Sequence, residues 1–319
     1  METNTPRPLR PGSDETRGLW LGLLGVVIFS MTLPMTRLAV GPLSDPQLPP
    51  LFVTAGRAAF AGLLSALYLW FTHAPRVQRR HLPALFTSAL GTVVGFPLFL
   101  SLALRQVDAM HAAVVTGLMP LATAVGAAIF FRQRPSNGFW VCAALGCAMV
   151  LAFAAYRGSG HLSPADGLLL IAVFFTAVGY VAGARVAAEL PAEQVICWVL
   201  VLSLPLTLPL MIATWPETPV RASAWGGFTY VTLFSMWLGF FAWYRGLALG
   251  GTVRVSQVQL VQPFLALLFA VPVLGETLDT VTVLFSLAVI AVVFIGKKMP
   301  ANVPERQAQS SALTPVRPR

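Results

Sequence analysis

The sequence predicts an all-α polytopic membrane protein whose ten transmembrane helices form two inverted five-helix repeats. Three observations support this fold class. The chain contains ten long apolar runs, the segments that connect these runs alternate between rich and poor in Lys and Arg, and the two halves of the chain align around Pro120 and Pro263. Together they indicate a bundle of helices that crosses a bilayer ten times.

The composition excludes a soluble globular class. Of the 319 residues, 56% are hydrophobic and only 10% are charged, whereas a soluble domain carries about 25% charged residues. A soluble fold of this size cannot cover so much apolar surface, so the lipid bilayer is the expected environment. The net charge of +9 resides in short connections and tails, as it does in membrane proteins, and we expect no nucleic-acid partner.

The ten apolar runs define the spans. A membrane helix needs about 20 mostly apolar residues, and a chain in lipid must be helical because lipid offers no hydrogen-bond partners to an open strand edge. The runs cover residues 18–40, 50–72, 82–104, 109–131, 138–156, 163–186, 192–214, 224–247, 253–273 and 279–296. Polar tails, residues 1–17 and 297–319, flank them.

The basic residues predict the orientation of the helices. With the N-terminus in the cytoplasm, the cytoplasmic segments hold 16 Lys and Arg residues and the outer segments hold 4. A bias of this kind sets the topology of membrane proteins. We therefore expect a multi-pass protein of a bacterial-type inner (plasma) membrane, with the N-terminal and C-terminal tails both cytoplasmic.

The second half of the chain repeats the first in inverted orientation. An offset of 143 residues relates Leu104 to Leu247 and Pro120 to Pro263, and self-similarity on this scale indicates duplication. We assign residues 18–156 to the first repeat and 163–296 to the second. Five spans per copy is an odd number, so the second copy enters the membrane from the other side, an architecture of transporters that alternate access.

Several motifs resemble those of one transporter family. They are an Ala/Gly-Leu element and a mid-span Pro in each half, the turn Gly275-Glu276, and Arg57 early in the second span; the stretch 243–263 is the closest match. At these positions the chain resembles the EamA branch of the drug/metabolite transporter superfamily, over residues 18–296. The resemblance implies a central cavity lined by spans 1, 3, 4, 6, 8 and 9, and small organic substrates, often amino acids or related metabolites, which are usually exported.

The chain departs from the family pattern in two places. The first of the two equivalent turns reads Arg132-Gln133 where the family often has Gly-Glu. In the first span, Phe29-Ser30 and Arg37 stand where the family often has Trp-Gly and a downstream Lys. The second departure touches a cavity helix, so the substrate class is not carried over from the family.

The ninth span is the most polar. Gln259 and Gln262 lie three residues apart, as do Ser256 and Gln259, and residues with this spacing share a helix face. Amides in lipid are costly unless they are paired, so this face is expected to point inward. We interpret Ser256, Gln257, Gln259 and Gln262 as a hydrogen-bonding wall for a polar substrate; hydrogen bonding between helices is the alternative.

Four prolines fall inside spans that are expected to line the cavity, namely Pro34, Pro97, Pro120 and Pro263. A Pro inside a helix removes a backbone hydrogen bond and frees a carbonyl one turn earlier. We interpret the set as helix kinks that take part in gating. Static kinks are the alternative, because membrane helices tolerate Pro.

Arg57 lies about seven residues, or roughly 10 Å, into the second span. A charge at this depth is a candidate functional residue, and it would pair with a carboxylate or with a carboxyl group of the substrate. Snorkelling to the outer headgroups is the alternative interpretation.

Further candidates for the cavity wall are Ser30 and Thr32 in the first span, Tyr180 in the sixth and Trp237 in the eighth. For each of them, core packing remains an open alternative. His111 begins the fourth span near the outer surface, and we interpret it as a solvated cap rather than a proton relay.

The predicted function is that of a secondary carrier that exports a small polar or amphipathic metabolite, such as an amino acid, by alternating access. No Asp or Glu lies deep in a span, whereas many proton-coupled carriers use such a group. We therefore expect a facilitator or exchanger, or coupling through a group near a span end.

We expect no cofactor and no bound metal. We also expect no ATP hydrolysis, because the chain lacks a Walker A motif. A membrane-embedded enzyme is one alternative, but no catalytic constellation is evident. A non-transporting sensor or assembly subunit is another. The expected assembly is a monomer or a homodimer.

Overall fold

The computed structural model describes residues 13–130, 134–157, 160–187, 189–250, 255, 257–298 and 301–302. Seven helices in this part of the chain are long and apolar enough to cross a membrane: 15–40, 50–71, 79–103, 109–130, 137–157, 164–187 and 193–213. Shorter apolar helices cover 258–274 and 280–296, and the remaining crossing is the helical segment 222–250. The predicted all-α fold with ten helices is confirmed.

The first half of the chain contains five crossings. They are α1 (Ser13–Ser30) with α2 (Thr32–Val40); α3 (Pro50–Phe71); η1 (Arg79–His81) with α4 (Leu82–Ser88), the π-helix η2 (Ala89–Gly95) and α5 (Phe96–Ala103); α6 (Ala109–Thr116) with α7 (Met119–Phe130); and α8 (Asn137–Arg157).

The second half contains five more. They are α9 (Pro164–Ala187); α10 (Ala192–Ala213); α11 (Ala222–Tyr230) with the π-helix η3 (Val231–Leu238) and α12 (Gly239–Gly250); the 3-10 helix η4 (Gln257–Val261) with α14 (Gln262–Leu274); and α15 (Thr280–Lys298). Two-residue strands, β1 (Arg134–Pro135) and β2 (Ala301–Asn302), pair antiparallel.

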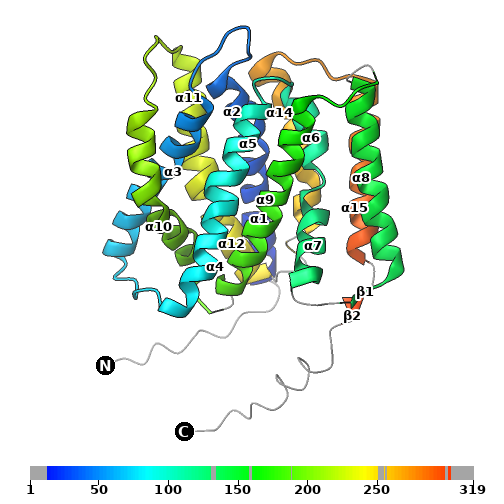
Figure 1. The fold of residues 1–319 in the computed structure, drawn as a ribbon. Coiled ribbons are helices and arrows are strands. Elements are labelled where there is room, and N and C mark those ends of the chain that lie inside the picture. Colours follow the sequence, from blue (N-terminus) through cyan, green and yellow to red (C-terminus); the bar gives the residue numbers. More distant parts are fainter. Residues whose placement is uncertain are drawn as a thin grey trace.

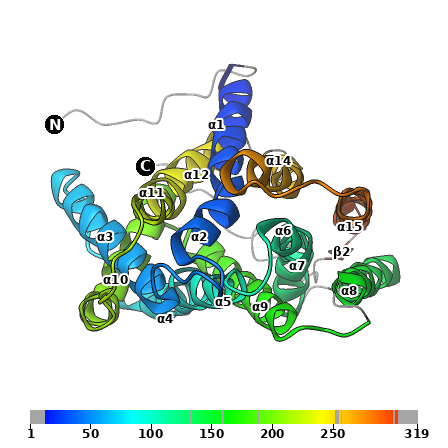
Figure 2. The ribbon, with the colours of Figure 1, turned by 90° about the horizontal axis from the view of Figure 1, so that it is seen from above.

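The core of the bundle lies between the two repeats. Each crossing of the first half has extensive contacts with a crossing of the second: α1 with α12, α3 with α10, α5 with α9, α6 with α14, and α8 with α15. Viewed from above, α8 and α15 form a pair at one edge of the bundle (Figure 2). A substrate that crosses the protein along its core would therefore pass between the repeats.

Glycines allow two of these helix pairs to approach closely. A Cβ atom on Gly91 of η2 would lie 2.5 Å from the Cα of Gly179 in α9. In the same way, a Cβ atom on Gly246 of α12 would lie 2.6 Å from the backbone nitrogen of Gly22 in α1. Small residues that permit such approach are a common basis of helix association in membranes.

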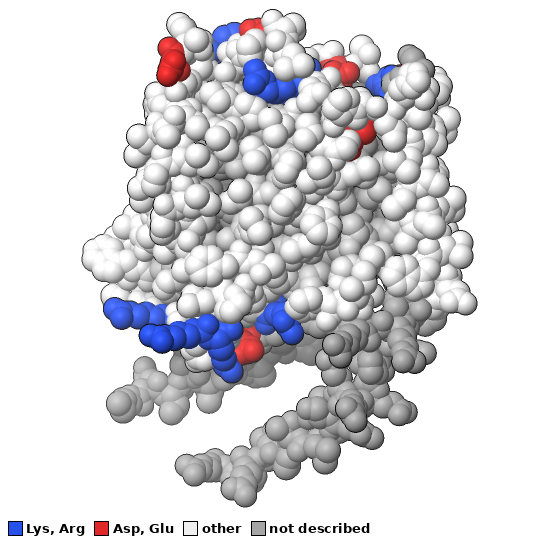
Figure 3. Space-filling view, in the orientation of Figure 1, with Lys and Arg blue, Asp and Glu red and all other residues white. Residues whose placement is uncertain are grey.

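Exposed charged side chains gather at the two ends of the bundle. Figure 3 shows basic and acidic residues along both the upper and the lower edge of the molecule, mainly basic ones along the lower edge, and a broad uncharged band between them. We call the end that carries the connections 41–49, 104–108 and 275–279 the Glu276 face, and the end that carries 72–81 and 187–193 the Glu189 face (Figure 1). The Glu276 face is the side predicted to be external.

Candidate functional site

Arg57 is buried in the uncharged interior of the bundle. Its position in α3 leaves the residue only 2% exposed, which excludes snorkelling to the headgroups. Its Nη2 donates to the Ser235 hydroxyl at 3.3 Å, and that hydroxyl lies 2.8 Å from the Thr32 hydroxyl. The buried Nε and Nη1 atoms have no hydrogen-bond partner among the described residues.

A small cavity of about 40 Å³ borders this guanidinium. We call it the Arg57 cavity. Its lining comes from seven crossings. Six of them are the first, third, fourth, sixth, eighth and ninth, which the family resemblance implies, and the seventh is the second crossing, α3. The lining residues are Phe29, Thr32, Leu33, Arg57, Thr92, Phe96, Met119, Thr176, Tyr180, Ser235, Met236, Phe240 and Gln262.

A second cavity of about 20 Å³ lies where equivalent residues of the two repeats meet. The offset of 143 residues pairs Thr116 with Gln259 and Pro120 with Pro263, and all four line this cavity. Met119 and Gln262 form another such pair, and both line both cavities. The pseudo-two-fold axis of the repeats therefore passes close to the site.

The same offset relates two π-helical segments. It maps Thr92 of η2 onto Ser235 of η3, and both residues line the Arg57 cavity. π-Helical turns inside α-helices are rare and are frequent at functional sites. Sequence reasoning missed Thr92 and Ser235; their shared repeat position was the signal available.

Besides Arg57, the structure brings together four of the residues proposed from the sequence for the cavity wall. Gln262 lines both cavities, Gln259 lines the smaller one, and Thr32 and Tyr180 line the Arg57 cavity. Gln259 lies in the 3-10 helix η4 rather than in a continuous α-helix. Because residues three apart also align in a 3-10 helix, Gln259 and Gln262 still share a face.

Other proposed residues lie elsewhere. The Ser30 hydroxyl donates to the Val26 carbonyl of its own helix at 2.7 Å. Trp237 packs against Phe241, with ring centroids 5.1 Å apart. Neither Ser30 nor Trp237 lines either of these cavities. Ser256 and the side chain of Gln257 lie outside the described residues.

The four prolines lie where one helical segment of a crossing passes into the next. Pro34 lies in the first turn of α2, Pro97 of α5, Pro120 of α7 and Pro263 of α14. Each follows an interruption, which is a turn, a π-helix or a 3-10 helix. Met31, Gly95 and Val261, which directly precede three of these segments, have right-handed helical φ and ψ, so the crossings continue through the prolines and each Pro removes one backbone donor there.

The Glu276 face holds the two repeats together. The Glu276 carboxylate accepts hydrogen bonds from the backbone N–H groups of Ala109 (2.7 Å) and Met110 (2.9 Å), at the start of α6. Burial raises the pKa of this carboxyl group, against the lowering effect of those N–H groups. Ion pairs join Arg157 to Asp279 at 3.3 Å and Arg221 to Asp45.

His111 belongs to the same set of contacts, and its interpretation as a solvated cap is wrong. Its side chain is buried, and Nε2 lies 2.6 Å from Oδ1 of the buried Asp166. Ser163 supplies two further hydrogen bonds to Asp166, from its backbone N–H and its hydroxyl, each 2.8 Å long. The partner lies 55 residues away, so no local pattern indicated it.

On the Glu189 face, one acidic residue joins the repeats. The Glu189 carboxylate lies 2.8 Å from Arg80 and 3.0 Å from His81. The hydrogen bond with His81 and the charge of Arg80 lower the pKa of Glu189. A second pair on this face, Arg245 with Glu193 at 3.6 Å, lies within the second repeat.

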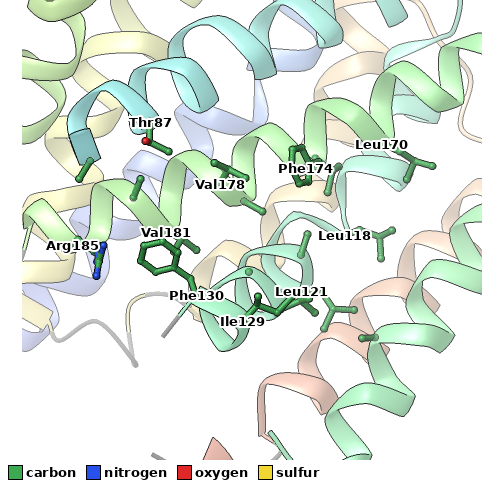
Figure 4. A pocket seen from close by; sticks show the side chains of 18 of the residues that line it. Thr87, Leu118, Leu121, Ile129, Phe130, Leu170, Phe174, Val178, Val181 and Arg185 are labelled. Atoms are coloured by element: carbon green, nitrogen blue, oxygen red, sulfur yellow. The ribbon is translucent and has the colours of Figure 1, made fainter. Parts of the chain in front are cut away.

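A third cavity is apolar and separate from the Arg57 cavity. It has a volume of about 620 Å³ and lies between α4, α7, α8 and α9. Figure 4 shows aliphatic and aromatic side chains along its wall, with Arg185 and Phe130 at one end. The exposure of Phe174 and Ile129 opens it toward the band that lipid covers, and its walls offer little for recognition of a polar solute.

Comparisons with known proteins agree on one family. Residues 16–154 and 163–296 each match the model of the EamA-like transporter family. The chain is 41% identical over 288 residues to the "Uncharacterized transporter YdeK" of Bacillus subtilis (strain 168), with 89% of this chain and 99% of that protein covered. A solved crystal structure with 18% identity matches with a TM-score of 0.60, covering 88% of this chain and 98% of its own, which supports the fold.

Proposed function

This chain belongs to the EamA-like transporter family and is a membrane transporter, and from that premise we propose that it exports a small polar or amphipathic metabolite, such as an amino acid, by alternating access. The observation that carries the proposal is the meeting of equivalent residues at the site. Thr116 and Gln259, and Met119 and Gln262, come from opposite repeats and line one cavity. Transporters with inverted repeats bind their substrates at such an interface.

The size of the site supports a change of conformation during transport. Cavities of about 20 and 40 Å³ have room for a few water molecules, whereas binding pockets for small molecules measure about 300–1,000 Å³. A metabolite therefore reaches Gln262 and Tyr180 only after the repeats have separated on one side.

The distribution of contacts supports opening toward the Glu189 face. Among the described residues, the repeats are joined at the Glu276 face by Glu276, by His111 with Asp166, and by two ion pairs. At the Glu189 face they are joined through Glu189 and through Arg185 of α9, whose guanidinium lies 4.3 Å from the centroid of the Phe130 ring of α7. We infer that the conformation described here is closed toward the Glu276 face, and that transport alternates between breaking the two sets of contacts.

The coupling mechanism follows from the position of the acidic groups. Among the described residues, Asp166 is the one buried carboxyl group, and it lies near the start of α9. We infer facilitated transport or exchange; coupling to protons would pass through the His111–Asp166 pair.

Flux measurements in proteoliposomes test the proposal. The full chain is reconstituted, a panel of labelled amino acids and related metabolites is presented, and counterflow is measured with and without a pH gradient. We expect saturable flux of at least one solute that protein-free liposomes do not show. If folded, reconstituted protein moves no member of the panel, the proposed substrate class is overturned.

The orientation is tested separately. We propose that both termini are cytoplasmic, because the basic segments would then lie inside. Reporter tags at each end should both read cytoplasmic, and one external terminus would overturn this topology.

A further inference from the structure

We propose that Arg57 is the binding residue for the single negative charge of the transported substrate, and that the substrate is a small organic monoanion, a carboxylate with an apolar body. This inference rests on the proposed transport function and specifies the class of its substrate. It begins from an unusual juxtaposition, a buried guanidinium with two unpaired donors on a residue that lines a cavity.

The charge of Arg57 is uncompensated in this conformation. Arginine keeps its charge in proteins, and none of the ion pairs among the described residues involves Arg57. The Ser235 hydroxyl is a neutral partner. A buried charge without a counter-charge is strongly unfavourable, so a site that retains one gains most from a ligand that supplies the opposite charge.

The free donors suit a carboxylate. Nε and Nη1 of Arg57 are both buried and without a hydrogen-bond partner among the described residues. A guanidinium binds the two oxygens of a carboxylate through two parallel N–H groups, either of Nε with Nη2 or of Nη1 with Nη2, so Nε or Nη1 of Arg57 would act together with the second N–H of Nη2. Thr32, Thr92 and Thr176 line the same cavity, and their hydroxyl groups are hydrogen-bonded to the Ser235 hydroxyl and to the carbonyls of Ser88 and Ala172, respectively.

The rest of the wall determines the body of the ligand. Phe29, Phe96, Met119 and Phe240 supply apolar surface to the Arg57 cavity. Because Arg57 is the one cation in this lining, a second negative charge on the ligand would remain unpaired in a medium of low dielectric constant. A monoanion with an apolar body satisfies both conditions, and a polyanion does not.

Matched carboxylates and amides test this assignment. Purified full-length protein in detergent is titrated with monocarboxylates from formate to phenylacetate and with the amide of each, and thermal unfolding is followed. We expect carboxylates to raise the Tm and the neutral amides of the same shape to have little effect. If no carboxylate in the series stabilises the protein, or if the amides do so equally, the assignment is overturned.

Variants locate the effect at Arg57. We expect Arg57→Gln to weaken carboxylate binding by about tenfold or more and Arg57→Lys to retain part of it, because an ammonium keeps the charge without the planar fork. Arg76→Gln, which removes a charge from an exposed connecting loop, is the control and should bind as the wild type does. Carboxylate binding that persists in Arg57→Gln would overturn the proposal.

Two further measurements keep the test decisive. If Arg57→Gln does not yield folded protein, the comparison of Arg57→Lys with Ser235→Ala decides: the lysine variant, which retains part of the binding, should still lose more affinity than Ser235→Ala, and a larger loss in Ser235→Ala would contradict the assignment. Flux of neutral solutes without any preference for carboxylates would refute the role of Arg57 and leave the transport function intact. Carboxylate binding without flux would support the role of Arg57 and contradict the proposed transport function.

Discussion

Asp166 of α9 accepts a buried hydrogen bond of 2.6 Å from His111 of α6, and this bond joins the two repeats at the Glu276 face. Both side chains are nearly inaccessible to solvent. We expect His111→Ala to lower the free energy of unfolding by about 1–3 kcal/mol, because it leaves a buried carboxyl group without one of its partners. Thermal unfolding in detergent measures the loss, with His73→Ala at an exposed turn as the control. Equal stability of the two variants would contradict this role.

Glu276 caps the helix that begins at Ala109. Glu276→Ala leaves the N–H groups of Ala109 and Met110 without their acceptor, and loss of a cap costs about 0.5–2 kcal/mol. We expect this contact also to hold the Glu276 face closed. In a background without native cysteines, a Cys introduced at the buried position Leu104 should react faster with an impermeant maleimide when Glu276 is replaced. Unchanged labelling would argue against a gate at this face.

The contact at the Glu189 face is expected to depend on pH. The pKa of Glu189 is held below its ordinary value of 4.5, chiefly by the hydrogen bond with His81 and by the charge of Arg80. A carboxyl group with a lowered pKa stabilises the fold above its unfolded pKa, and this contribution disappears as the pH falls through the folded value. Glu189→Gln should therefore unfold at a lower temperature than wild type near pH 7, and the difference should vanish near pH 3. A difference that is independent of pH would show that the charge is not involved.

The two glutamines of the ninth crossing are expected to differ in their effect on transport. Gln262 lines both cavities, whereas Gln259 lines only the smaller one. Gln262→Ala should reduce flux more than Gln259→Ala while leaving expression in the membrane intact. Gln106→Ala, at an exposed position, is the control. Normal flux in both cavity variants would remove this crossing from the site.

Close approach of η2 and α9 is expected to depend on Gly179. A Cβ atom there would lie 2.9 Å from the backbone nitrogen of Thr92, and overpacking of this kind costs about 1–3 kcal/mol. Gly226→Ala is a matched control, because nothing lies within 4 Å of its added Cβ and Ala is the better helix former. We expect the Tm to fall in Gly179→Ala and to hold or rise in Gly226→Ala. A shift in the opposite order would refute the packing argument.

Much of the architecture was accessible to sequence reasoning, because lipid restricts what an apolar chain can do. Runs of about 20 apolar residues must be helical there, and each predicted run corresponds to a crossing in the described structure. The repeat offset was equally accessible, since Pro120 and Pro263 are visible in the sequence. It later proved to relate Thr92 to Ser235 as well.

The sequence by itself determined the fold class, the duplication and the presence of Arg57 within a span. The tertiary structure decided that Arg57 is buried beside a cavity with one neutral partner, that His111 is bonded to Asp166, and that Glu276 caps α6. Helical periodicity states which residues share a face, but it carries no information on which distant helix that face will meet. The partner of each polar group is set by long-range packing between the repeats, and here that packing forms the site.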